Sequence, residues 1–224
     1  MSFSLLRLAL VDSTQSFLIR HPELGFCAVL ADHQSAGRGR AGNRWESPSG
    51  AGLWLSVRMP IPAIPPGLVL QQAMAAVIAV LAPCGVELGL KWPNDLVAWK
   101  AGRLVKVGGI LGEAKGGQLI LGLGINLASA PLLPDRRIPP AALMELGAVG
   151  LPSREVLALR ILAAWETLEI SGMPAFRWPV AGEALSWEGG QGLCLGWEGD
   201  GRLRVATPRG IEWLSAGEVN SLVG

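Results

Sequence analysis

The chain has 224 residues and a net charge of +1; half of the residues are hydrophobic and 17% are charged. This composition excludes a disordered chain, and so small a net charge provides no global field to attract nucleic acid. The three cysteines form no CxxC pair, which argues against a metal site or disulfide framework and favours buried thiols in a reducing cytoplasm. We therefore expect a globular domain, with room for a small second unit.

Strands and helices are expected to follow one another through the first two thirds of the chain. Asp12-Ser13-Thr14 supplies helix N-cap chemistry directly after the first strand, and Ala101-Gly102 marks the turn of a hairpin. The most apolar stretch, 66–84, contains two glutamines and suits a buried helix better than a membrane span. In chain order, the predicted strands cover residues 4–11, 26–31, 52–59, 96–99, 104–113 and 118–127, and the predicted helices cover 14–20, 66–82, 139–147 and 153–171.

The pattern changes near residues 174–182, where two prolines and a glycine interrupt the chain. Short strand-like runs separated by glycine-containing turns follow, and they predict a small SH3-like β-barrel. These runs cover residues 192–197, 203–207, 211–215 and 218–222. We place the domain boundary between a main domain, 1–180, and a second unit, 181–224. The second unit is too small to fold alone and should pack on the main domain.

Residues 34–50, QSAGRGRAGNRWESPSG, form a glycine-rich and basic segment, named here the arginine loop. Arg38, Arg40 and Arg44 alternate with glycines in it. Glycine lets the backbone approach a ligand closely, and arginine offers a planar fork of donors suited to carboxylate or phosphate. The segment therefore predicts a flap that folds over an anion, although a solvated surface loop would have a similar composition.

A second group of motifs combines polar side chains with glycines at the ends of predicted strands. KWPND (91–95) puts a cation and a carboxylate four positions apart across a proline turn. Lys106 begins a strand beside two glycines, and GLGIN (122–126) again places glycines next to a polar side chain. Each motif alone fits a surface lysine, a β-bulge or a turn. Their combination and order indicate a binding site at a sheet edge.

These motifs resemble those of biotin protein ligases, also called biotin–[acetyl-CoA-carboxylase] ligases. The matching segments are DSTQ (12–15), QSAGRGRAGNRWESPSGAGLWLS (34–56), KWPND (91–95), KVGGILGE (106–113), GLGIN (122–126) and GRLRVATPRGIEWLSAGEV (201–219). The resemblance implies an α+β fold, with a mixed β-sheet flanked by helices and then an SH3-like β-barrel. Because the first motif starts at Asp12, we expect the type that lacks an N-terminal DNA-binding domain.

The resemblance implies an enzyme that activates biotin with ATP as biotinyl-5′-AMP. The biotinyl group would then pass to a lysine of the biotin carboxyl carrier domain of a carboxylase. Biotin and ATP would be the substrates and Mg²⁺ the metal. We expect a cytoplasmic monomer or homodimer with no DNA or membrane partner. Since the first step brings together two anions that repel, catalysis should depend mainly on positioned cations.

The resemblance also implies roles for individual residues, with Lys106 between the biotin carboxylate and the α-phosphate and the first two arginines closing over both. The expected catalytic residues are Lys106, Arg38, Arg40 and Lys91. The residues expected to bind biotin are Ser13, Thr14, Gln15, Gln34, Gly37, Arg38, Gly39, Arg40, Lys106, Gly109, Leu111 and Gly122. Those expected to bind ATP are Arg38, Arg40, Trp45, Lys91, Lys106 and Asn126, with Trp45 stacked on adenine; Asp95 is expected to bind Mg²⁺.

Two positions depart from the family pattern: Gln15 stands where the first motif more often has asparagine, and Asn43 where the loop often has arginine. Other functions stay open at this point. A lipoate or octanoate ligase or transferase would share the fold, and a catalytically impaired biotin-binding protein would carry the same motifs. Nucleic-acid binding through the arginine loop would need a wider basic face than a net charge of +1 suggests.

Overall fold

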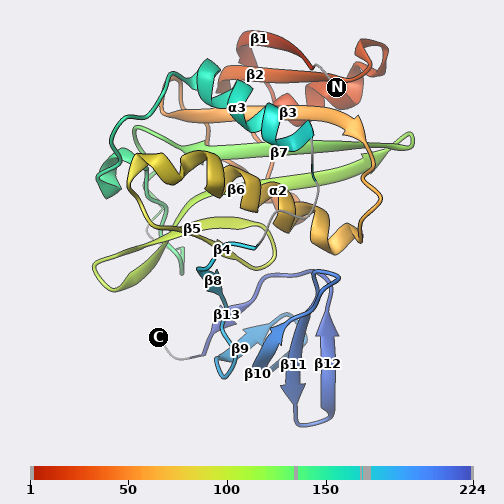
Figure 1. Ribbon diagram of the computed structural model, residues 1–224, viewed down its shortest axis with the longest axis vertical. Helices are drawn as coiled ribbons and strands as arrows, with labels where there is room; N and C mark the ends of the chain where they lie inside the picture. Colours follow the sequence, from red (N-terminus) through yellow and green to blue (C-terminus); the bar gives the residue numbers. More distant parts are fainter. Residues whose placement is uncertain (1–2, 134–135, 167, 169–172, 223–224) are drawn as a thin grey trace.

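The computed structural model describes residues 3–133, 136–166, 168 and 173–222, and its strands form two sheets (Figure 1). The larger sheet has eight strands in the order β1-β2-β3-β7-β6-β5-β4-β8. Its two outermost pairs, β1 with β2 and β4 with β8, are parallel, and the other pairs are antiparallel. The strands are β1 (Ser4–Val11), β2 (Cys27–Gln34), β3 (Gly52–Pro60), β4 (Leu88–Lys91), β5 (Asp95–Lys100), β6 (Arg103–Lys115), β7 (Gln118–Asn126) and β8 (Arg177–Trp178).

The smaller sheet is antiparallel, with five strands in the order β12-β11-β10-β9-β13. Its strands are β9 (Ala184–Trp187), β10 (Gly190–Trp197), β11 (Leu203–Thr207), β12 (Gly210–Leu214) and β13 (Asn220–Ser221). A mixed sheet with helices, followed by a second antiparallel sheet, confirms the predicted fold class. The first sheet ends at Trp178 and the second begins at Ala184; the boundary between 180 and 181 stays a prediction.

Helices cover the two faces of the larger sheet differently. Helices α2 (Pro66–Leu81) and α3 (Arg154–Glu166) lie together over one face, where they bury the main apolar core (Figure 1). The short helix α1 (Thr14–Arg20) packs on the other face through Leu18. The segment 66–84 is long and apolar enough to cross a membrane, but 61% of it is buried, as the prediction of a core helix requires.

The predicted helix over 139–147 is wrong. Residues 139–141 instead run alongside β6, where Lys106 N donates to Pro139 O (2.9 Å) and Ala141 N donates to Lys106 O (2.9 Å). Pairing between β6 and β7 reaches only as far as Gly108, so the backbone of Lys106 takes this segment as its partner. Two consecutive prolines disfavour a helix there, and only a 3₁₀ turn, η4 (Met144–Leu146), forms.

The other sequence predictions differ from the structure mainly at element ends. Helix α3 begins after Ser153, as predicted, and ends at Glu166; residues 167 and 169–172 of the predicted 153–171 lie outside the described residues. The strands β4, β8 and β9 are not among the predicted strands, because they are only four, two and four residues long.

The two sheets share buried contacts. Trp92, which precedes the proline of KWPND, packs in one cluster with Trp178 and with core residues of the smaller sheet such as Leu185. The carbonyl of Gly201, in the turn between β10 and β11, accepts from Trp92 Nε1 (3.0 Å) and Gln71 Nε2 (2.6 Å). The smaller sheet is therefore packed on the larger one, as its size suggested.

Candidate active site

A cavity of about 570 Å³ opens on the face of the larger sheet that carries α1. The residues that form its floor can be identified from the alternation along each strand, because successive side chains of a strand point to opposite faces of the sheet. Leu55 and Val57 belong to the core beneath α2, so Ser56 between them points the other way. The floor positions placed by this rule are Ser56 of β3, Gly109 and Leu111 of β6, and Gly122 and Gly124 of β7.

Residues that the sequence assigned to the site come together around this cavity, although they lie up to 113 positions apart. They are Ser13, Thr14, Gln15, Gln34, Arg38, Gly39, Arg40, Trp45, Lys91, Asp95, Lys106, Gly109, Leu111, Gly122 and Asn126. Gly37 is the exception among the predicted residues. A Cβ there would lie 2.3 Å from the Trp45 carbonyl oxygen, so this glycine allows two loop segments to approach and does not line the cavity.

Polar groups gather where α1 begins. Ser13 is the N-cap and accepts a hydrogen bond from Ser16 N (3.3 Å). Gln34 Oε1 accepts from Thr14 N (2.8 Å) and Thr14 Oγ1 (3.1 Å), and Gln34 Nε2 donates to Ser47 Oγ (2.7 Å). These side chains are buried and held in fixed orientations, which suits recognition of a compact polar group.

The opposite end of α1 is fixed by Arg58, a buried arginine of β3 that the sequence analysis missed. Its guanidinium donates to backbone carbonyls at and after the end of the helix, namely those of Leu18, His21, Pro22 and Gly25. Carbonyls at a helix end lack partners within the helix, and a buried charge needs several hydrogen bonds. Arg58 satisfies both needs and thereby holds the helix whose first residues line the cavity.

The arginine loop is folded as a flap over the cavity. Its two arms pair at Gln34 with Ser47 and at Arg38 with Arg44, and a 3₁₀ turn, η2 (Arg40–Gly42), forms its tip. Arg38 makes a two-pronged ion pair with Glu113 of β6, with Nη–Oε distances of 2.9 and 3.0 Å. The loop is therefore connected to β6 through this ion pair.

The tip of the flap is attached to both sheets through Arg40. Its Nη1 donates to Asn94 Oδ1 (2.9 Å) and to the carbonyl of Gly217 (3.3 Å). Asn94 is 6% exposed, and its Nδ2 donates to the Ile110 carbonyl (2.6 Å). Asn94 was missed as a site residue, although its place in the KWPND motif was a signal for it.

Lys106 and Asp95 form an ion pair in the wall of the cavity, with Nζ and Oδ1 2.7 Å apart. A β-bulge lies beside it: Leu96 pairs with Gly108 and Val97 with Lys106, so β6 has one extra residue, Val107. A bulge of this kind re-aims neighbouring side chains and often occurs next to active sites. It lets Val107 remain in the core while Lys106 lines the cavity.

Trp45 lies over Gly124 of β7, in the floor of the cavity. A Cβ on Gly124 would lie 2.5 Å from the indole of Trp45, so only glycine leaves room for this ring. The indole is also 5.6 Å from Lys106 Nζ and packs edge-on against Trp54. Trp45 Nε1 and Asn126 Oδ1 are buried and lack partners among the described residues, which leaves a donor and an acceptor for a ligand.

Gly122, which was predicted to bind biotin, lines the cavity and also lies against a protein side chain. A Cβ there would lie 2.5 Å from Gln15 Oε1. The space above this glycine is thus taken by the amide of Gln15. Gly109 has only ordinary contacts, the nearest being Asp95 Oδ1 at 3.3 Å.

Residues of the C-terminal part and of the segment after β7 also line the cavity, and none of them was among the predicted site residues. They include Ser186, Trp187, Glu188, Gly217, Glu218 and Asn220 from the C-terminal part, and Arg136 and Arg137 from the segment before Ile138.

Lys91 is the most deeply buried of the predicted catalytic residues. It is 1% exposed, and its Nζ lies 5.2 Å from the centre of the Trp178 ring. Burial lowers the pKa of Lys91 from its ordinary value of 10.5, although the nearby carboxylates of Asp95 and Glu218 act in the opposite direction. The lysine is a buried charge in the cavity wall, not a solvated one.

We expect Lys91→Met to raise the melting temperature at neutral pH and to lose this advantage as the pH rises toward 10.5. Because the pKa of Lys91 is lower in the folded protein, the unfolded chain binds more protons between the folded and unfolded pKa values. The stability of the wild-type protein therefore rises with pH in this range, and the advantage of the methionine variant shrinks. Melting temperatures of both proteins, measured from neutral pH to about 10, test this. A difference that stays constant with pH would contradict it.

Comparisons with known proteins agree with this arrangement. The profile of the biotin/lipoate A/B protein ligase family matches residues 9–128, which contain the arginine loop and the motifs around Lys91, Lys106 and Asn126. This chain belongs to that family. Family membership agrees with the fold class predicted from the sequence.

Two curated relatives are similar to parts of the chain. The biotin–[acetyl-CoA-carboxylase] ligase of Mycobacterium tuberculosis is 36% identical over 150 residues, covering 62% of this chain and 52% of the relative. The bifunctional ligase/repressor BirA of Salmonella typhimurium is 36% identical over 188 residues, covering 76% and 57%. The chain thus spans just over half the length of these relatives.

Solved structures match nearly the whole chain. The biotin protein ligase from Aquifex aeolicus in complex with biotin and ATP is 26% identical, with a TM-score of 0.74 and coverage of 97% of this chain and 98% of the other. The biotin protein ligase from Leishmania major in complex with biotinyl-5-AMP is 25% identical, with a TM-score of 0.59 and coverage of 96% and 100%.

Proposed function

We propose that this chain is an ATP-dependent biotin protein ligase, an enzyme that forms biotinyl-5′-AMP and transfers biotin to a lysine of a biotin carboxyl carrier domain. One observation carries the proposal. Four cations from three separate segments, Arg38, Arg40, Lys91 and Lys106, line a single cavity together with a buried polar cluster. The family match and the ligands bound to the solved relatives support the same activity.

In the first step, a carboxylate oxygen of biotin attacks the α-phosphorus of ATP, and pyrophosphate leaves. The two reacting groups are both anionic, so their approach must be offset by fixed positive charge. Lys106 is proposed to lie between them, with Arg38 and Arg40 above. In the second step, the amine of the carrier lysine attacks the acyl carbon, AMP leaves, and an amide forms.

The ammonium of Lys106 is paired with the carboxylate of Asp95. Substrate anions would therefore compete with an internal carboxylate, and the ion pair holds the lysine near its working position before they arrive. The side chain is 31% exposed, so it can shift toward a ligand without unfolding the strand that carries it. Preorganised charge of this kind lowers the reorganisation needed in the transition state.

Mg²⁺ fits this site as an ion bound together with the nucleotide. Among the described residues, no three His, Cys, Asp or Glu side chains gather into a metal site. Mg²⁺ often binds one or two carboxylates and otherwise water and substrate phosphates. Asp95, with an 18% exposed carboxylate in the cavity wall, is the residue proposed to hold it. When bound, the ion would neutralise phosphate charge.

The two ends of the cavity suit the two substrates. The polar cluster of Ser13, Thr14 and Gln34 is proposed to bind the ureido head of biotin, whose size and polarity match it. The unused donor of Trp45 and acceptor of Asn126 are proposed to face adenine. We assign the cytoplasm as the site of action, since ATP and the carrier domain are both found there.

Biotin-dependent exchange of pyrophosphate into ATP tests the function directly. We expect exchange with biotin and none without it, and tight biotin binding with no exchange would instead indicate a non-catalytic binder. Because the matched family also includes lipoate ligases, biotin and lipoate should be compared by isothermal titration. Preferential binding of lipoate would overturn the choice of substrate.

Replacing Arg40 by glycine should increase the loss of biotinyl-5′-AMP from the enzyme about tenfold, because it removes the contacts of the flap tip with Asn94 and Gly217. Released adenylate acylates bystander proteins, which a blot for biotin detects. Arg44→Gly is the matched control: Arg44 also lines the cavity, but among the described residues its side chain has polar contacts with Ser35 and Glu46 of its own loop and none with Asn94 or Gly217, so leakage should stay near the wild-type level. Equal leakage from both variants would contradict this role of Arg40.

A further inference from the structure

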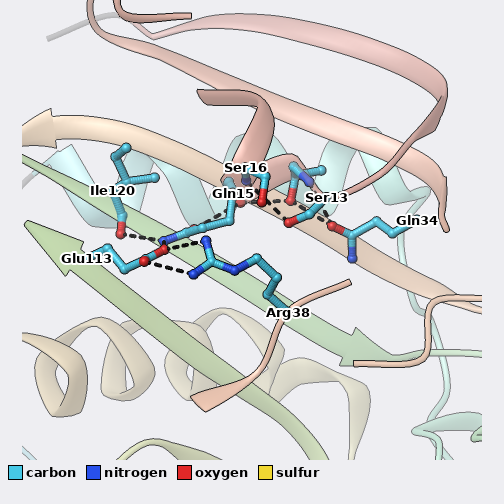
Figure 2. A network of polar contacts seen from close by, with 9 residues as sticks. Ser13, Gln15, Ser16, Gln34, Arg38, Glu113 and Ile120 are labelled. Carbon is cyan, nitrogen blue, oxygen red and sulfur yellow. Dashed lines mark hydrogen bonds and ion pairs between the residues drawn. The ribbon is translucent and has the colours of Figure 1, made fainter. Parts of the chain in front are cut away.

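Helix α1 is held to the larger sheet at both of its ends, and the contacts at its start lie beside the cavity. Thr14 Oγ1 lies 2.7 Å from Ser56 Oγ of β3 and donates to Gln34 Oε1 of β2 (3.1 Å). Gln15 Oε1 accepts from Ser56 Oγ (3.3 Å). On its other side, Gln15 Nε2 donates to the Ile120 carbonyl of β7 (3.1 Å; Figure 2). Three strands therefore hold the residues with which the helix begins.

At the other end of α1 the anchor is the guanidinium of Arg58, a residue of β3 that is 2% exposed. Its Nη1 donates to the carbonyls of His21 (3.0 Å), Gly25 (3.2 Å) and Pro22 (3.3 Å), and its Nη2 donates to that of Leu18. One side chain thus joins the last turn of the helix to the segment that leads into β2. A guanidinium can do this because its donors point in several fixed directions.

The two anchors on β3 lie under opposite ends of the helix. Ser56 and Arg58 stand two positions apart, so both side chains point to the face that carries α1, about 7 Å apart along the strand. The seven residues of α1 span about 10 Å. Between the anchors, Leu18 is fully buried among apolar residues of β2 and β7. Apolar packing is not directional, so the hydrogen bonds at the two ends determine how far the helix is shifted along the sheet.

Helix α1 contributes to the polar end of the cavity and not to the end assigned to adenine. Ser13, Thr14 and Gln15, at the N-cap and directly after it, line the polar end. The buried donor of Trp45 and acceptor of Asn126 belong to the arginine loop and to β7. A displacement of α1 would therefore move the first group of side chains and leave the second group in place.

We propose that Arg58 is a positioning residue for biotin: it fixes the end of α1 through backbone carbonyls and thereby sets where the polar side chains at the start of the same helix stand. The choice of biotin as the ligand rests on the proposed function. Groups that recognise a ligand must be held within about 0.5 Å of the productive geometry, and a displacement of about 1 Å can cost about 10²-fold. Because α1 is one short hydrogen-bonded unit, a movement at its end also displaces its start.

Binding of biotin and of ATP, each measured by isothermal titration, tests this role in Arg58→Met and Arg58→Lys. Methionine keeps an unbranched apolar side chain and removes every donor. Lysine keeps the charge but gathers its donors on one atom, so it cannot reach all four carbonyls. We expect the Kd for biotin to rise about tenfold or more with methionine and by a smaller factor with lysine, whereas the Kd for ATP should stay within about twofold in both.

Leu162→Ala is the matched control for a loss of stability. Leu162 is 3% exposed in α3, in the core on the face of the sheet opposite α1, so its truncation destabilises the protein without changing the cavity. Biotin binding by this variant should match that of the wild type. Hydrogen–deuterium exchange of the amides of residues 17–21 should become about threefold to tenfold faster in Arg58→Met and stay unchanged in Leu162→Ala. Amides of β3 and β7 should remain protected in all variants.

Equal losses of biotin and ATP affinity in the Arg58 variants would overturn the proposal, because they would indicate a general effect on stability, and unchanged biotin binding would overturn it as well. If Arg58→Met fails to fold, Arg58→Lys alone decides, since it keeps the buried charge. Absence of biotin binding in the wild type would refute the proposed function, whereas faster exchange of α1 in the Arg58 variants would still support the hold of Arg58 on this helix.

Discussion

Replacing Lys106 by alanine should abolish adenylate formation, lowering biotin-dependent pyrophosphate exchange at least about 10³-fold. Loss of one preorganised donor at a developing charge typically costs 10²- to 10³-fold, and here the donor is also the cation proposed to lie between two repelling anions. The protein should stay folded, because the ion pair of Lys106 with Asp95 is partly solvent-exposed and such pairs add about 1 kcal/mol or less to stability.

Lys115→Ala provides the matched control for this experiment. Lys115 is an exposed lysine at the other end of the same strand, β6, so its loss removes an equal charge far from the cavity. Exchange by this variant should be close to that of the wild type. Melting curves of both variants check the fold. Exchange near the wild-type level in Lys106→Ala would show that the assignment of the central lysine is wrong.

The parts of the fold that could be predicted from the sequence are those with local causes. The hairpin at Ala101-Gly102 forms because both residues adopt positive φ, with values of 49° and 76°, as a tight turn between two strands requires. Helix α1 begins at its Ser13 cap, and the long apolar segment after Pro65 is a core helix. The site motifs could be found for a similar reason, because each one is a short run of neighbouring residues in which glycines and polar side chains stand together at the end of a predicted strand.

The features that could not be predicted from the sequence depend on contacts between residues far apart in the chain. An arginine within a strand is ordinarily a surface charge, and only the packing of α1 against β3 explains why Arg58 is buried. The hydrogen bond of Glu113 with Gln15 depends on how β6 and β7 are paired, which no local pattern reveals. A helix was predicted over 139–147, yet residues 139–141 pair with Lys106 on the side of β6 that β7 does not reach.

The largest effect on stability is expected at Trp92, where a motif of the active site enters the core of the second sheet. Trp92 is 1% exposed and packs with Trp178, Leu185 and Val219, and its Nε1 donates to Gly201 O. Trp92→Ala should lower the free energy of unfolding by about 3–5 kcal/mol, since it removes a large buried ring and leaves a cavity. For a chain of this length the melting temperature should fall by about 10 °C.

Two further variants separate the causes of that loss. Trp92→Phe keeps most of the apolar volume but removes the hydrogen bond, so it should lose less stability than the alanine variant; the Gly201 carbonyl still accepts from Gln71. Trp213, which is 47% exposed on the smaller sheet, is the control, and Trp213→Ala should stay within about 0.5 kcal/mol of the wild type. If Trp92→Ala were equally mild, the two sheets would be held together by other contacts. If it is severe, the residues of KWPND that line the cavity depend on the second sheet for their position, since Lys91 and Asn94 flank the same tryptophan–proline pair.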